Sequence, residues 1–132
     1  MRVAKRFIAS PHPNFIRPLP PPFIIYTETC TWYGGLTFAD LIHDEQLQER
    51  LSERFEPLFD NSAHLVPEPD HVDKTVFGAI PFELNMQTGK SAYRDMGLHF
   101  AENQWNIPPD PEILPEGKRF AESGYSWQTR LW

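Results

Sequence analysis

The chain has 132 residues, of which 40% are hydrophobic and 14% aromatic, and its net charge is −6. This length and composition predict one domain with a single hydrophobic core. The only cysteine, Cys30, excludes an internal disulfide and a zinc site built from several cysteines, and it favours a reducing compartment. No run approaches the roughly 18 apolar residues of a membrane span, and Phe7–Ala9 is too short for the apolar core of a cleaved signal. We therefore expect a soluble protein, either cytoplasmic or part of a virion or organellar complex.

Positive charge is concentrated at the start of the chain. Every residue before Glu28 that carries a charge is basic, so the body that follows is strongly acidic. An acidic body repels a phosphate backbone, and nucleic-acid binding is therefore not expected except through the basic N-terminal part. The basic residues of this part are Arg2, Lys5, Arg6 and Arg17.

Residues 1–22 are predicted to form an extended, basic, proline-rich arm in front of a single domain at 23–132. The run of prolines up to Pro22 favours the polyproline II conformation, which leaves backbone groups available to a partner. The arm partly matches the start of an SH3 ligand, although Phe23 replaces the final proline. The alternative is an arm packed along its own domain or a neighbouring subunit. The residues expected to contact a partner are Phe15, Ile16, Arg17, Leu19 and Pro20.

The stretch Phe23–Tyr33 is rich in β-branched and aromatic residues, which predicts a strand covered on both faces. Gly34 and Gly35 then predict a turn, and they lack the lysine or glycine pattern of a phosphate-binding loop.

Two helices are predicted after this turn, at about 37–43 and 45–56. Their apolar residues fall on two faces roughly 130° apart, so one straight helix cannot bury both. Asp44 is predicted to cap the second helix, and Pro57 is predicted to end it or to lie just past its end. The first face holds Phe38, Leu41 and Ile42, and the second holds Leu47, Leu51, Phe55 and Leu58.

The second half of the chain predicts a β-hairpin at 75–94. Phe82, Leu84 and Met86 alternate with polar residues, and Gly89 suits the left-handed position of the turn. Leu98–Phe100 adds a short strand. The predicted fold class is thus α+β, with a small antiparallel sheet, one or two helices and much irregular structure.

Three features hold candidate catalytic or metal-binding groups. Glu28 is a candidate acid if it is buried, although such a residue more often pairs with an arginine or lies at a strand edge. His43 adjoins two carboxylates at a helix boundary. A loop containing His64, His71 and two aspartates, Asp70 and Asp73, holds residue types that bind divalent metals. No motif fixes any of these groups, so we assign no catalytic residue, no metal site and no cofactor.

These features favour binding over catalysis. We expect a non-catalytic accessory, structural or assembly subunit whose partners are protein chains in a larger assembly or a homo-oligomer. It would dock through the arm and through an aromatic C-terminus, since tryptophan dominates interface energetics. One alternative is an acidic inhibitor of the immunity or antitoxin type, and another is a small enzyme with a His/carboxylate site. The C-terminal residues expected to bind the partner are Trp127, Leu131 and Trp132.

Overall fold

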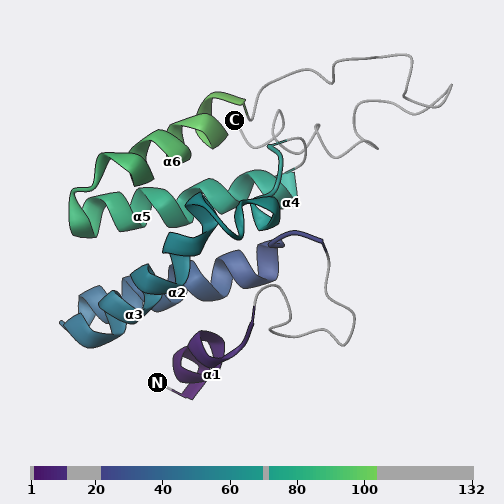
Figure 1. Cartoon of the computed structure of the whole chain (residues 1–132). Helices are drawn as coiled ribbons and strands as arrows, with labels where there is room; N and C mark the ends of the chain where they lie inside the picture. The colour runs from purple at the N-terminus through teal and green to yellow at the C-terminus, as the bar shows by residue number, and fades with distance from the viewer. Residues whose placement is uncertain (1, 12–21, 70–71, 104–132) are drawn as a thin grey trace, which may run out of the picture.

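The computed structural model describes residues 2–11, 22–69 and 72–103, and within these ranges the chain is helical with no strand (Figure 1). The predicted α+β fold and its antiparallel sheet are therefore wrong. The elements in chain order are α1 (Arg2–Ala9), α2 (Tyr26–Leu41), α3 (Glu45–Phe55), the 3-10 turns η1 (Glu56–Phe59) and η2 (Ala63–Leu65), α4 (Val72–Thr75), the 3-10 turn η3 (Val76–Gly78), α5 (Ala79–Thr88) and α6 (Ser91–Asn103).

The helices lie in three tiers (Figure 1). α2 is central: it packs against α3 and α5, and α1 covers a further part of it. α6 packs along α5 at the far side of the molecule from α1. Among the described residues, no helix combines the length and the apolar character needed to cross a membrane.

From Tyr26 onward the predicted strand at 23–33 is instead the start of α2, and residues 23–25 lead into this helix. The residues that α2 buries recur every three or four positions, which is helical spacing, and burial of this stripe overrides the β-propensity of its threonines and aromatics. Thr31 and Thr37 satisfy their hydroxyls by donating to the carbonyls of Thr27 and Tyr33, four residues earlier, at 2.8 and 3.0 Å. The buried residues of α2 are Glu28, Thr29, Trp32, Leu36 and Ala39.

The glycine pair does not form a turn, because both glycines lie in the middle of α2. Gly35 faces α3, and a Cβ atom at this position would lie 3.3 Å from Cδ1 of Leu51. Gly34 faces outward, and a Cβ atom there would meet nothing within 4 Å. One glycine therefore allows α2 and α3 to approach each other, while the other leaves the outer surface of α2 open.

The second predicted helix is confirmed as α3. Asp44 is its N-cap and accepts a hydrogen bond from the backbone N–H of Leu47 at 3.0 Å. Pro57 lies just beyond the end of α3, in η1. The predicted helix at 37–43 is the last part of α2, and the chain turns at His43, whose φ is 55°.

The predicted hairpin at 75–94 is also wrong, because this stretch contains the end of α4, the turn η3, the whole of α5 and the start of α6. Leu98–Phe100, predicted as a strand, lies within α6. Gly89 does adopt the left-handed conformation, with φ 73°, but it caps α5 rather than a hairpin. Pro81 is compatible with helix because it lies in the first turn of α5.

Aromatic side chains fill the centre of the bundle. Phe55 of α3 is the hub, with ring centroids 5.4 Å from Trp32, 5.8 Å from Phe77 and 5.5 Å from Tyr93. Phe7 extends this cluster to α1, 5.5 Å from Trp32. All five side chains are buried, so α1 belongs to the core of the described structure.

Candidate functional site

Glu28 is buried and paired with an arginine. Its Oε1 atom accepts a hydrogen bond from Nη2 of Arg54 at 3.1 Å, and only 2% of the Glu28 side chain and 7% of the Arg54 side chain are exposed. Nη1 of Arg54 donates to the backbone carbonyls of Ile8 and Ser10, and its guanidinium lies 4.2 Å from the ring centroid of Phe7. This pair therefore ties α1 to α2 and α3.

The Arg54 guanidinium is held in a desolvated position. Burial lowers the pKa of Arg54, and the adjacent Glu28 carboxylate opposes this shift. A buried carboxylate that is paired with a buried arginine acts as a structural group. We therefore assign Glu28, the candidate acid, a structural role.

The candidate histidines do not form a site with Glu28. His43 and His64 are both exposed, in a turn after α2 and in η2, respectively. Asp73 is exposed in α4, while Asp70 and His71 lie outside the described residues. Within the described ranges, no group of three or more His, Cys, Asp or Glu side chains is placed to hold a metal ion.

A polar network lies where α3 meets α5 and α6. Oε1 of Glu56 accepts hydrogen bonds from the Tyr93 hydroxyl at 2.7 Å and from Nζ of Lys90 at 2.9 Å. Lys90, followed by Tyr93, lowers the pKa of Glu56, whereas burial raises the pKa of Tyr93. The Tyr93 hydroxyl also shares a hydrogen bond of 2.9 Å with Ser52.

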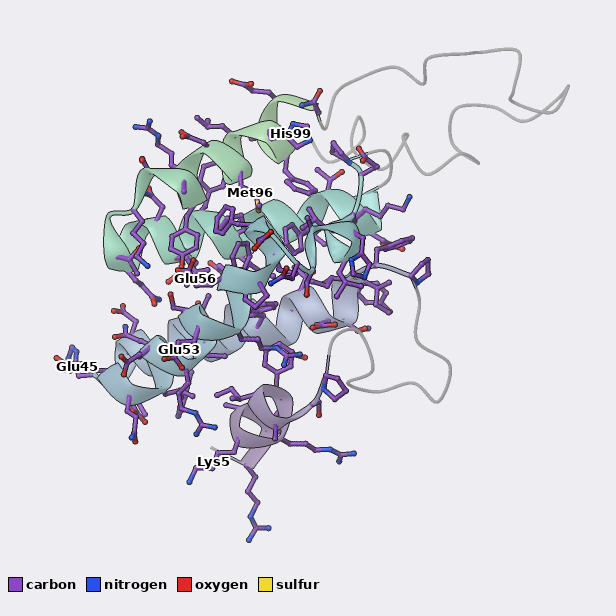
Figure 2. All side chains as sticks on the ribbon, viewed as in Figure 1. Lys5, Glu45, Glu53, Glu56, Met96 and His99 are labelled. Atoms are coloured by element: carbon purple, nitrogen blue, oxygen red, sulfur yellow. The ribbon has the colours of Figure 1, made fainter. Side chains whose placement is uncertain are left out.

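This network closes one end of a groove of about 390 Å³ between α3 and α5. Figure 2 shows Glu45 and Glu53 following one another along α3, with Glu56 next at the start of η1. The groove has an acidic rim, and an inhibitor of the immunity or antitoxin type would depend on this surface. Its only lysine, Lys90, already neutralises Glu56.

The outer face of α2 differs from the surface of α3 because none of its residues is charged. Leu41 is 73% exposed, Tyr26 47% and Phe38 41%, and the exposed thiol of Cys30 lies between them. The only charged residues of α2 are the buried Glu28 and, at one edge of this face, Asp40. We define the α2 outer face as Tyr26, Cys30, Tyr33, Gly34, Thr37, Phe38 and Leu41.

A shallow apolar groove runs along one side of this face. It has a volume of about 270 Å³ and lies between α1 and α2. Val3 and Ala4 of α1 form one wall, and Cys30, Gly34 and Phe38 are among the residues of α2 that line it. The groove and the α2 outer face together form a continuous uncharged surface.

The partner-binding residues predicted in the arm and at the C-terminus lie outside the described residues, and they remain predictions. These are Phe15, Ile16, Arg17, Leu19, Pro20, Trp127, Leu131 and Trp132.

The sequence interpretation missed the α2 outer face because it read half of α2 as a strand. One signal was present: the 16 residues of α2 contain only two charged side chains. The apolar face of Phe38, Leu41 and Ile42 was recognised, and the structure leaves all three side chains exposed. An apolar helical face that the other described residues leave uncovered is a signal for docking.

No protein-family model matches the chain, and no solved structure gives a significant match.

Proposed function

We propose that this protein is a non-catalytic binding subunit of a larger protein assembly, and that the α2 outer face is its docking surface. The observation that carries the proposal is the absence of charge on this exposed helical face. The exposed side of a surface helix normally carries charged and polar residues. The fully buried centre of a protein interface, by contrast, is depleted of charge and enriched in aromatic residues.

The shape of the α2 outer face supports docking of another chain. Tyr26, Tyr33 and Phe38 supply aromatic area, whereas Gly34 and Cys30 leave room between them for the close approach of a second element. Aromatic residues around a close contact are typical of the residues that carry most binding energy. The arm and the C-terminal Trp132 are proposed to extend this contact.

The proposal is tested with two matched substitutions. Leu41→Glu and Met86→Glu each replace an exposed apolar side chain with a carboxylate. The two positions are matched in exposure, at 73% for Leu41 and 72% for Met86. Leu41 lies on the α2 outer face, and Met86 lies on α5. Because neither side chain is buried, both variants should fold.

The measurement is the native size of the protein in gently lysed cells of its source, by size-exclusion chromatography and immunoblotting. We expect the wild type and Met86→Glu to elute well above the mass of one 15.4 kDa chain, and Leu41→Glu to shift towards it. A wild type that elutes as a single chain, or a Leu41→Glu variant that stays in the assembly, would contradict the proposal.

A further inference from the structure

We infer that the chain docked on the α2 outer face is a second copy of this protein, with the two α2 helices parallel about a two-fold axis. The inference rests on the proposed function and names its partner. Two observations support this inference: the middle of the α2 outer face carries no charge, and charged residues lie along its two edges.

A symmetric contact places the same surface patch against itself, so residues near the axis meet their own copies. Any charged residue there would face a like charge. Two copies that each carry a net charge of −6 repel each other over most orientations. Cys30, Thr37 and Leu41 lie along the middle of the α2 outer face and carry no charge, so this face meets the requirement for self-association.

The two edges of the face carry opposite charge. On one edge α1 contributes Arg2, Lys5 and Arg6, and it has no acid. Figure 2 shows Lys5 projecting from α1 away from the rest of the molecule. On the other edge is Asp40, roughly 180° around α2 from Thr31, which lines the groove against α1.

These edges select the parallel arrangement. When the two-fold axis runs along α2, the α1 edge of each copy faces the Asp40 edge of the other. Val3, the residue after Arg2, lines the same groove as Phe38, which lies two residues before Asp40. In an antiparallel pair the two basic α1 helices would face each other, and their like charges would oppose the contact.

The contact is a small one. A helix of 16 residues is about 24 Å long, and a patch one helix long is smaller than the roughly 800 Å² per partner of a standard interface. We therefore expect a dimer with a dissociation constant on the order of micromolar. In the cell it would be one contact of a larger assembly.

The test uses the purified full chain and two readouts. Sedimentation equilibrium over a range of concentrations measures the dimer, and a short bismaleimide linker measures the distance between the two Cys30 thiols. Cys30 is exposed and is the only cysteine, so a cross-linked dimer must join Cys30 of each copy. In a parallel pair these residues lie opposite each other, whereas in an antiparallel pair Cys30 would face Thr37.

Two variants serve as controls. Cys30→Ser combined with Ala92→Cys moves the thiol to an exposed position on α6, and it should give no cross-linked dimer. Leu41→Glu should raise the dissociation constant at least about tenfold, because it places two carboxylates beside the axis.

The expected result is a concentration-dependent dimer with a Cys30 cross-link, weakened by Leu41→Glu. A monomer at high concentration overturns the inference, as does equal cross-linking of the α6 thiol. A dimer without a Cys30 cross-link overturns the parallel arrangement. If the purified chain is monomeric while the wild type still elutes in a larger assembly from cell extract, the inference fails and the proposed function stands.

Discussion

Replacing Arg54 by methionine tests the link between the buried ion pair and the fold. Arg54 and Glu28 are almost fully buried, with 3.1 Å between Nη2 and Oε1. Methionine keeps the aliphatic packing but leaves the Glu28 carboxylate without this cation. Breaking a buried pair from one side costs about 3–5 kcal/mol. Since single domains are stable by only about 5–15 kcal/mol, this loss should be a large part of the total.

A double-mutant cycle separates the pair from other effects of the substitution. When both partners of a buried ion pair are replaced by apolar residues, the result is often neutral or stabilising. We therefore expect Glu28→Leu to rescue Arg54→Met by at least about 2 kcal/mol. The assay is urea unfolding followed by far-ultraviolet circular dichroism, with the free energy of unfolding extrapolated to water. Simple additivity of the two single substitutions would refute the reasoning, because it would mean that the two side chains do not interact in the folded protein.

Three further predictions concern glycines and pH. Gly34→Ala should stabilise the monomer by up to about 1 kcal/mol in urea unfolding, because alanine favours helix and its Cβ meets nothing. Gly97→Ala should instead cost about 1–3 kcal/mol, because its Cβ would lie 2.9 Å from the ring of Phe82; the opposite ranking of these two variants would contradict the packing described. Lys90 lowers the pKa of Glu56. The stability contributed by ionised Glu56 is therefore present above the unfolded-state pKa of Glu56 and is lost as pH falls through its folded-state pKa. Glu56→Gln should therefore make the free energy of unfolding fall less steeply at acidic pH. An unchanged pH dependence would show that the ionisation of Glu56 does not stabilise the fold.

The parts of the fold that sequence predicted depend on local signals. α3 was predicted because Leu47, Leu51 and Phe55 follow one another at helical spacing after an N-cap, Asp44. All of these signals lie within one helix and its cap. Each of the three apolar side chains is buried, as that spacing requires.

The failures depend on contacts that no local pattern reveals. α2 is rich in residues that favour strands, and its helical state is stabilised by burying one stripe against residues distant in sequence, as when Glu28 pairs with Arg54, 26 residues away. In α5 the alternation of Leu84 and Met86 suggested a strand, but Leu84 is buried with Ile80, one helical turn earlier, and Met86 is exposed. Short segments with mixed propensity are decided by tertiary packing.

The candidate site was partly visible for the same reason. An apolar helical face can be predicted from the sequence once a helix is assigned, as with Phe38 and Leu41. Whether that face is exposed cannot be predicted in this way, because exposure depends on which sides of α2 are covered by α1, α3 and α5.

The most direct test of the α2 outer face as a docking surface is the rate at which a maleimide reagent alkylates Cys30 in native cell extract. Cys30 is exposed among the described residues and lies on this face, and the chain has no other cysteine, so alkylation of this protein reports on Cys30 alone. Docking predicts slow alkylation of the wild type and fast alkylation of the Leu41→Glu variant, whatever the partner is. Equal, fast alkylation of both proteins would show that the face is open in the cell and would contradict the account.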